Sequence, residues 1–505
     1  MNAPTPELAR RVEGPSSDLP AKELIDAAFA WEIADAPCLH HGLNVADLGH
    51  VLDLHQRGIV PTAAAQALIG TLLVAYRTEA SDFPYDAQYG EPYNSRERHF
   101  VAQIGDAAGW LHAGRPRREA ARVALRIGLR RLTAELLHAT ASLAETTAKV
   151  AARHRDVLMA DQTYLQQAQP STFGHYLLAF VPPALRDADR LLAALHQINR
   201  SPGGAGCVNG SRLLGDRGVI AQLLGFDDVI EHTRDAMWQT DTFVDVLAAG
   251  TSVLSNQSKL AEDLEIWSSQ EFDYVDLAGP YTRASVLMPQ KRNPYSLSIV
   301  RGSSGVLIGR LTGFLAVVKS PSARSDNLIF AYGEIPRALE FATKICHLMR
   351  GVIDTMTVNQ ARMWKVLEDG FCQATDLAEH IMLEAGIDYR SAYRVSGEAV
   401  KTASRQGLRG VDIGVAAIDA AAAKLGIGPL SLDAAALAQA LDPRAIVATR
   451  IAQGGAAPAA VAAMAERYGS AAQVLAREAQ ASLDAYLRAE LELVRKAEEL
   501  QRRPA

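Results

Sequence analysis

Residues 119–154 read EAARVALRIGLRRLTAELLHATASLAETTAKVAARH, a long stretch without proline. Apolar side chains recur in it at heptad-like spacing, at Leu125, Leu129, Leu132, Leu136, Ala139, Leu143 and Val150. At a rise of 1.5 Å per residue, this pattern predicts a helix about 50 Å long. A rod of that length needs other long helices beside it, so the segment by itself predicts a helical bundle.

Four further segments carry long apolar patterns of the same kind: residues 173–197, 240–267, 295–318 and 334–356. The first contains Pro182-Pro183, which should kink or interrupt its helix. Aromatic residues make up only 6% of the chain, and the alternating β-branched runs typical of strands are scarce. The sequence therefore predicts an all-α protein with three helical domains: residues 1–118, a central long-helix bundle at 119–367, and residues 368–505, which end in a charged amphipathic helix at 470–503.

The charge balance of the chain excludes some kinds of binding partner. Among 505 residues, 51 Lys and Arg face 57 Asp and Glu, which gives a formal charge of −6, and no stretch is densely basic. This balance argues against nucleic acid and against an anionic membrane as partners.

The N-terminal stretch lacks the apolar core of a secretory signal, and the apolar run at 313–318 is ended by Lys319. We expect a cytoplasmic protein.

The four cysteines, Cys38, Cys207, Cys346 and Cys372, lie far apart, without CxxC spacing or neighbouring paired histidines. This pattern favours buried thiols in a reducing compartment over disulfides or metal ligands. We therefore expect no metal site.

The least helix-like polar stretch of the bundle region runs from residue 281 to 294 and reads YTRASVLMPQKRNP. It places a hydroxyl (Ser285), an ammonium (Lys291) and an amide (Asn293) close together between two prolines. A turn there could present backbone N–H groups to an anion. On composition alone, a solvated surface loop is the simpler interpretation.

The order of residues in this stretch changes that interpretation. The string from Ser285 to Pro294, Ser-x-x-Met-Pro-x-Lys-x-Asn-Pro, resembles the signature of the fumarase/aspartase superfamily, and LMPQKRNP resembles its argininosuccinate lyase branch. Further blocks resemble the same branch in the same order: IGDAAG and LHAGRPR within 104–117, TYLQQAQP at 163–170 followed by Gly174-His175, LAEDL at 260–264, and EDGFCQATDL at 368–377. The resemblance covers about residues 90–410.

This resemblance implies a fold, an assembly and a reaction. It implies a helical homotetramer whose central domains pool their long helices, with active sites assembled from three regions of three subunits. Those regions here lie around residues 93–118, 163–169 and 285–293. The implied reaction is elimination, in which a proton leaves the carbon beside a carboxylate and a C–N or C–O bond then breaks, usually releasing fumarate. The implied substrate is a small dicarboxylate, a fumarate adduct, and neither a metal nor an organic cofactor is required.

The resemblance also implies roles for residues of this chain. Ser285 matches the base, and Lys291 and Asn293 match the groups that meet the dianion formed when the proton leaves. Tyr164 stands where the branch has a histidine and is a candidate acid, although a tyrosine packed between helices is the simpler interpretation. The expected substrate-binding residues are Arg117, Thr163, Arg118, Asn94, Ser95, Met288 and Gln169. Arg118 is equally well explained as a solvated residue at a helix start.

Other positions differ from the branch in ways that affect the leaving group. Tyr93 also replaces a histidine, Pro116 and Val286 replace serines, and the residues that would grip the arginine part of argininosuccinate fall near Ser325 and Phe330. These changes spare proton abstraction but remove polar partners of an arginine-bearing group. We therefore expect a C–N lyase that cleaves another N-substituted aspartate, or that adds an amine to fumarate.

Three alternatives come from the same resemblance: a true argininosuccinate lyase of arginine biosynthesis, a C–O lyase or cycloisomerase of a related polycarboxylate, and an inactive crystallin-like structural protein. The retained Ser285, Lys291 and Asn293 disfavour the last of these. A glycine-rich stretch at 203–210 (GGAGCVNG) has GxGxxxG spacing but lacks the strand and acid of a dinucleotide site, so a nucleotide cofactor is rejected.

Overall fold

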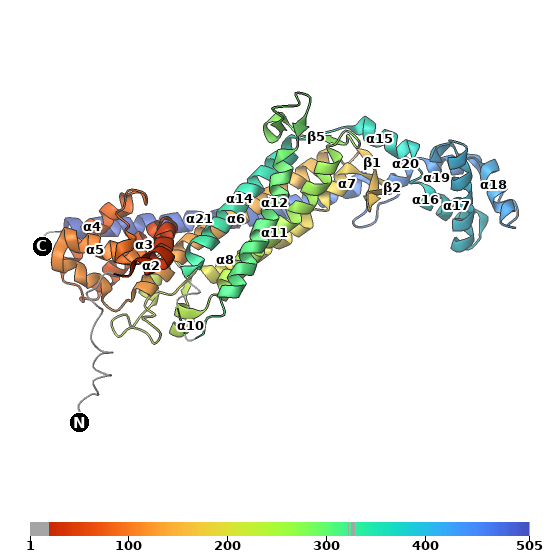
Figure 1. Ribbon diagram of the computed structural model, residues 1–505. Helices are drawn as coiled ribbons and strands as arrows, with labels where there is room; N and C mark the ends of the chain where they lie inside the picture. Colours follow the sequence, from red (N-terminus) through yellow and green to blue (C-terminus); the bar gives the residue numbers. More distant parts are fainter. Residues whose placement is uncertain (1–19, 322, 325–328, 504–505) are drawn as a thin grey trace.

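The computed structural model describes residues 20–321, 323–324 and 329–503. The molecule is elongated: N-terminal helices lie at one end, long helices form the middle, and short C-terminal helices lie at the other end (Figure 1). This confirms the prediction of an all-α protein built on a long-helix bundle. No helix in the described part of the chain is long and apolar enough to cross a membrane.

Helix α6 (Arg117–Arg153) is the central helix of the bundle. It contains almost all of residues 119–154, whose apolar pattern predicted a long helix. Its 37 residues span about 55 Å, and the apolar stripe from Leu125 to Val150 is buried. Helices α8 (Val181–Ile198) and α14 (Ala331–Thr355) pack on α6, α11 (Asp241–Trp267) packs on both of them, and α12 (Tyr295–Val317) packs on α11 and α14.

The interruption expected at Pro182-Pro183 is a helix boundary. Helix α7 (Phe173–Leu178) ends before the pair, and both prolines lie in the first turn of α8. Proline is tolerated there because the N–H groups of a first turn have no partner within the helix.

The terminal helix differs in position from the expectation. Helix α21 (Pro458–Arg502), whose sequence we assigned to the C-terminal domain, packs lengthwise on α6 and reaches α4 (Thr62–Arg77) at the N-terminal end. Its buried positions run from Val461 to Leu500, and so long a stripe can be covered only by helices of comparable length. Residues 458–502 thus belong with the bundle.

The C-terminal helices have a hydrophobic core of their own, separate from that of the bundle. They are α16 (Ala374–Ala385), α17 (Tyr389–Arg405), α18 (Val415–Lys424) and α19 (Ala434–Leu441). The domain boundaries expected at residues 118 and 367 stay predictions.

Three arginines at four-residue spacing on α6, Arg122, Arg126 and Arg130, are buried. Five of their acceptors are backbone carbonyls at or just past the ends of neighbouring helices: Gln197, Ile198, Leu224, Gly225 and Gln239. The side chains of Thr242 and Asn199 also accept from them. Burial lowers the pKa of Arg126 to about 9. These guanidinium groups supply partners for carbonyls that helices leave unbonded at their C-termini.

The N-terminal helices α3 (Ala30–Gln56), α4 and α5 (Pro92–Ile104) gather around the first turns of α6. Helix α3 passes close to α6 at Gly42, where an added Cβ would lie 2.3 Å from the carbonyl oxygen of Ala124. Helix α3 therefore packs directly against α6.

Candidate active site

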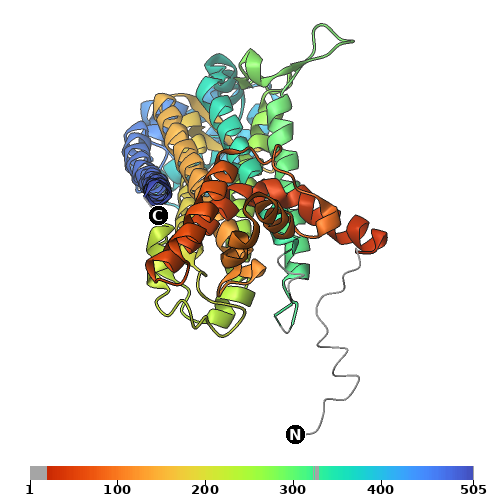
Figure 2. The same ribbon diagram turned by 90° about the vertical axis from the view of Figure 1, so that its left-hand side faces the viewer.

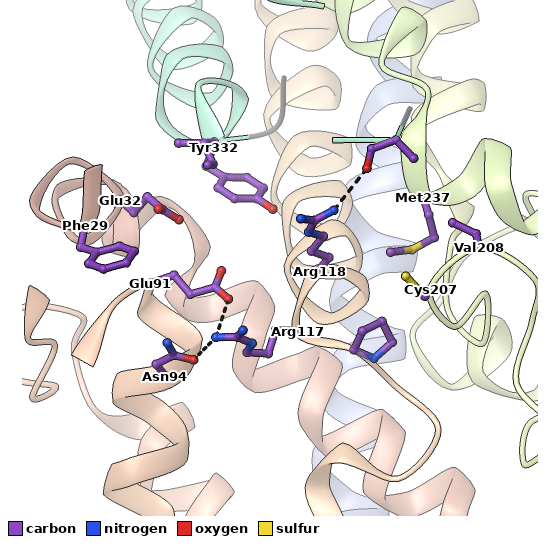
Figure 3. A pocket seen from close by; sticks show the side chains of 13 residues that line it. Phe29, Glu32, Glu91, Asn94, Arg117, Arg118, Cys207, Val208, Met237 and Tyr332 are labelled. Atoms are coloured by element: carbon purple, nitrogen blue, oxygen red, sulfur yellow. Dashed lines mark hydrogen bonds and ion pairs between the residues drawn. The ribbon is translucent and has the colours of Figure 1, made fainter. Parts of the chain in front are cut away.

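A cavity of about 630 Å³ lies where the starts of α3, α5, α6 and α14 converge (Figure 3). The polar side chains that line it are Glu32, Glu91, Asn94, Arg117, Arg118 and Tyr332. Three of the expected substrate-binding residues, Asn94, Arg117 and Arg118, therefore meet in one place.

Arg117 is the first residue of α6 and follows Pro116, whose extended backbone caps the helix. Its guanidinium donates to Asn94 Oδ1 and lies 3.2 Å from Glu91 Oε1. Arg118 is exposed, and its Nη1 donates to the carbonyl oxygen of Ala323 at 3.3 Å. A planar guanidinium with two donor edges suits a substrate carboxylate.

Glu32 and Tyr332 line the same cavity, and sequence reasoning missed both. They are only 7% and 6% exposed, and within the described residues neither makes a hydrogen bond or ion pair. Burial raises the pKa of Glu32 to about 7; the Glu91 carboxylate adds to this increase and Arg117 opposes it. No motif marks these positions, because only the crossing of α3 and α14 over α6 brings them together.

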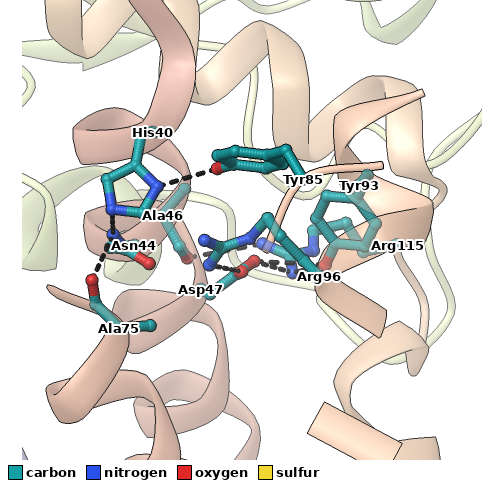
Figure 4. A network of polar contacts seen from close by, with 9 residues as sticks. All are labelled: His40, Asn44, Ala46, Asp47, Ala75, Tyr85, Tyr93, Arg96 and Arg115. Atoms are coloured by element: carbon teal, nitrogen blue, oxygen red, sulfur yellow. Dashed lines mark hydrogen bonds and ion pairs between the residues drawn. The ribbon is translucent and has the colours of Figure 1, made fainter. Parts of the chain in front are cut away.

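Tyr93, expected near the leaving group, lies instead in a buried polar network (Figure 4). Its hydroxyl donates to Asp47 Oδ1 at 3.1 Å and accepts from Arg115 Nη2 at 2.7 Å. Asp47 Oδ2 also accepts from Arg96 Nη2 at 2.7 Å. Burial would raise the pKa of Asp47, but Arg115 and Arg96 together lower it below its usual value.

Ser95, another expected substrate-binding residue, is also buried. Its hydroxyl accepts from the backbone N–H of Asp86 at 3.0 Å and donates to the carbonyl oxygen of Asp86 at 3.2 Å. In this chain both of these bonds hold the start of α5 against the loop that precedes it.

The glycine-rich stretch at 203–210 has a structural partner. The backbone N–H groups of Gly204 and Gly206 each donate to the Glu119 carboxylate at 2.6 Å. Both glycines have positive φ values, +76° and +63°, which glycine adopts without a steric penalty. The stretch therefore anchors the first turn of α6, two residues after Arg117.

The second expected region is a hairpin of β1 (Leu158–Thr163) and β2 (Gln166–Thr172). Its two-residue turn is Tyr164-Leu165, with φ of 56° and 59°, values that non-glycine residues rarely adopt. In this single chain Tyr164 is 98% exposed and is not packed between helices. The neighbouring candidates Thr163 and Gln169 are exposed as well.

The third region is the loop between β6 (Arg283–Ala284) and β7 (Arg292–Asn293), which projects away from the bundle (Figure 2). Ser285 Oγ accepts hydrogen bonds from the backbone N–H groups of Leu287 at 3.2 Å and Met288 at 3.0 Å. Lys291 is exposed, and Asn293 Nδ2 donates to the carbonyl oxygen of Arg283 at 3.0 Å. The Ser285 hydroxyl, directly after β6, is thus held by backbone N–H groups of its own loop.

One chain does not bring these three regions together. Neither the β1–β2 hairpin nor the Ser285 loop contributes to the lining of the cavity at Arg117. The hairpin lies at the end of the bundle that adjoins the short C-terminal helices, and α5 lies at the opposite end of the molecule (Figure 1). Of the positions expected to hold an arginine group, Phe330 is 41% exposed and packs edge-on against Trp31, whereas Ser325 lies outside the described residues.

Helix α12 presents an uncovered apolar face. Val306, Ile308 and Leu315 are 45%, 49% and 48% exposed. Four glycines lie on this helix with nothing within 4 Å of an added Cβ: Gly302, Gly305, Gly309 and Gly313. In one isolated chain this half of a central helix faces solvent, although its composition is that of a packed interface.

Comparisons with known proteins identify relatives over most of the chain. The lyase family matches residues 65–309, and the argininosuccinate lyase C-terminal family matches residues 371–448. An argininosuccinate lyase from Oceanobacillus iheyensis is 31% identical over 75% of this chain and 83% of its own length. Another, from Methanoculleus marisnigri, is 32% identical over 71% of this chain and 74% of its own length.

Solved structures of lyases and related enzymes have a similar fold. A variant of EDDS lyase with bound fumarate superposes with a TM-score of 0.84 at 25% identity, over 96% of this chain and 97% of that one. The 3-carboxy-cis,cis-muconate lactonizing enzyme from Pseudomonas putida shares the fold, with a TM-score of 0.71 at 20% identity over 90% and 100% of the two chains. The resemblance stated from the sequence motifs is confirmed.

Proposed function

The chain is a lyase of the argininosuccinate lyase branch of the fumarase/aspartase superfamily, and we propose that it cleaves the C–N bond of an N-substituted aspartate to give fumarate and an amine. Ser285 takes the proton from the carbon beside a carboxylate. The electron pair of that C–H bond forms the double bond of fumarate, and the C–N electrons leave with nitrogen, which gains a proton. Run backwards, the same steps add an amine to fumarate.

The environment of the Ser285 hydroxyl carries this proposal. A serine acts as a base only if its alkoxide is stabilised, and hydrogen bonds to the charged form lower the pKa of a group. The N–H groups of Leu287 and Met288 already point at Ser285 Oγ, at 3.2 and 3.0 Å. Lys291, in the same hairpin, supplies the positive charge that meets the dianion formed on proton removal.

Arg117 is the proposed anchor of a substrate carboxylate, with Thr163 and Asn293 as neutral donors from the other two regions. In this chain Arg117 is held by Glu91 and Asn94. These partners orient its guanidinium toward the cavity, and substrate would share or replace them. Tyr164, exposed at the tip of its hairpin, is the proposed acid that protonates the leaving nitrogen.

The separation of these regions on one chain supports a site built from several subunits. The long α12 helices, with their exposed apolar and glycine-rich faces, are the proposed contact between copies. We propose a homotetramer in which the Ser285 loop, the β1–β2 hairpin and the Arg117 cavity come from different subunits.

A true argininosuccinate lyase is the second candidate, favoured by the names of the curated relatives. Val286 and Phe330, both exposed and apolar, replace polar positions of that branch, and buried hydrogen bonds lost in this way cost about 1–3 kcal/mol each. We therefore expect argininosuccinate to be cleaved poorly.

Fumarate release from a panel of N-substituted aspartates, with argininosuccinate assayed beside them, tests the proposal. We expect fumarate from at least one aspartate other than argininosuccinate, at a rate that Ser285→Ala reduces to background. Efficient and selective cleavage of argininosuccinate would favour the second candidate. Absence of fumarate from every compound, with an assembled and folded protein, would contradict a C–N lyase.

A further inference from the structure

The turn of the β1–β2 hairpin is held only in part by the pairing of its own strands. Tyr164 and Leu165, its two turn residues, have φ of 56° and 59°, and such strain persists only where the surrounding structure maintains it. The strand pairing is also interrupted by a bulge between Ala160 and Gln162, which leaves two residue pairs between the bulge and the turn. The position of Thr163 and Tyr164 therefore depends on contacts that the hairpin makes with other elements.

Gln167 of β2 makes such a contact with the segment that leads into the C-terminal helices, which lie beside the hairpin (Figure 1). Gln167 is exposed in this chain, but its Oε1 accepts a hydrogen bond from the Cys372 thiol at 3.5 Å. Cys372 is itself buried, in a small hydrophobic cluster with Ala160 of β1 and Leu367 of α15 (Gln360–Asp369). One residue of the C-terminal segment thus packs with β1 and bonds to β2.

Gly370 lies against the same carboxamide. An added Cβ at this position would lie 2.3 Å from Gln167 Oε1, closer than a real side chain allows. The φ of Gly370 is −93°, which any residue adopts. The backbone conformation therefore does not require glycine here, whereas the close approach of Gln167 does.

The C-terminal domain holds the segment that Gln167 contacts. The backbone N–H of Gly410 donates to the carbonyl oxygen of Gly370 at 3.2 Å. An added Cβ at Gly410 would lie 2.7 Å from that oxygen and 2.8 Å from Oε1 of Gln373, which is 1% exposed. Because this packing leaves no free space, residues 370–373 form a fixed support for the hairpin.

Resting on the function proposed above, which assigns Thr163 and Tyr164 to the active site, we propose that Gln167 is a positioning residue. Its contact with Gly370 and Cys372 sets where the hairpin turn, and with it the proposed acid, lies in the site. Gln167 does not touch the substrate. Since a displacement of about 1 Å far from the reacting atoms can slow a reaction about a hundredfold, loss of this contact slows turnover more than it weakens substrate binding.

Gly370→Ala tests the contact, because it places a methyl group where the Gln167 carboxamide lies. On an aspartate that the wild type cleaves, we expect kcat to fall at least about tenfold and KM to change less. Gln167→Ala should lower kcat as well, by removing the restraint. Gly370→Ala should add little in that background, because the carboxamide it would meet is gone. The carbonyl oxygen of Val366, 3.2 Å from the added Cβ, accounts for any small loss that remains.

Gly397→Ala is the matched control, at an exposed position of α17 with nothing within 4 Å of an added Cβ, and should leave kcat unchanged. Cys372→Ser keeps a donor for Gln167 Oε1 and should retain more turnover than Cys372→Ala, which removes it. Wild-type kcat in Gly370→Ala would overturn the proposal. Losses that multiply in the double variant of Gln167 and Gly370 would also overturn it.

Hydrogen exchange of the backbone amides at the hairpin turn separates this inference from the proposed function. We expect faster exchange at the turn in Gln167→Ala than in the wild type. Unchanged exchange would overturn the positioning role even if the wild type releases fumarate. Faster exchange in a protein that releases fumarate from no N-substituted aspartate would support the contact and contradict the proposed reaction.

Discussion

Arg115 Nη2 lies 2.5 Å from Asp47 Oδ1, and both side chains are buried. Arg115 lies two residues before helix α6 begins, and Asp47 lies in α3. Asp47 also holds Arg96 and Tyr93. The Asp47 carboxylate of α3 thus connects the start of α5 to the turn that precedes Arg117. This network fixes the position of Arg117, which lines the cavity.

Asp47→Asn should destabilise the protein by about 3–5 kcal/mol, because it leaves two buried guanidinium groups without their counter-charge. Urea unfolding measures the loss, and Asp26→Asn, which removes only the exposed pair with Lys22, should cost less than about 1 kcal/mol. The folded-state pKa of Asp47 is lowered. Its contribution is therefore present above the pKa of an unfolded aspartate, about 3.9, and is lost as the pH falls through the folded value. Equal stability of the two variants at pH 7 would contradict a role for the network.

Ser285→Ala should reduce turnover by at least about a hundredfold, the usual contribution of a general base. Lys291→Met should have a comparable effect by removing the charge that meets the dianion. Circular dichroism and sedimentation should be unchanged, because the loop projects from the bundle (Figure 2). Gln290→Ala, exposed in the same loop, is the control and should retain turnover. Near-normal turnover of either variant on an established substrate would exclude its proposed role.

Ile308→Asp should prevent assembly, because it places a charge on the exposed apolar face of α12. Sedimentation velocity should show smaller species with intact helical content, and turnover should fall with assembly, since each proposed site needs several subunits. Leu383→Asp introduces the same charge at a position of α16 that is 73% exposed and should change neither property. A fully active monomer would rule out the composite site.

Glu32→Gln should stabilise the folded protein at pH 8. The pKa of Glu32 is raised to about 7, chiefly by burial and then by Glu91, with Asp35 adding and Arg117 opposing. The folded state therefore holds this proton more tightly than the unfolded chain does, and stability falls as the pH rises between the unfolded and folded values. Thermal melts should show a gain of up to about 3 kcal/mol at pH 8 that shrinks toward pH 4. A less stable variant at pH 8 would indicate that the carboxylate has a stabilising partner in the folded state.

Replacing Tyr164-Leu165 with Asn-Gly should relieve backbone strain, because both residues have positive φ. Such strain costs of order 1–3 kcal/mol per residue, so the hairpin amides should exchange more slowly with deuterium. Turnover should nevertheless fall with the loss of the proposed acid, and Tyr164→Phe should reproduce that loss without altering exchange. If Tyr164→Phe keeps full turnover, the acid lies elsewhere.

Local sequence determined the helical bundle and the family. The heptad-like stripe at 125–150 predicted α6, Pro182-Pro183 predicted the break between α7 and α8, and the Ser285–Pro294 string identified the superfamily. Each of these signals depends on residues that are near one another in the chain. Helical periodicity, proline geometry and a short motif are therefore legible without any knowledge of tertiary contacts.

The tertiary structure decided which side chains share a space. Glu32 lies 85 residues before Arg117 along the chain, and only the tertiary packing of the helices brings the two to one cavity. The same dependence on long-range packing explains why Tyr93 bonds Asp47 instead of lining the cavity, and why α21 lies along α6. The burial and pairing of a charge depend on which elements cross, and the crossing geometry is set by packing across the whole bundle.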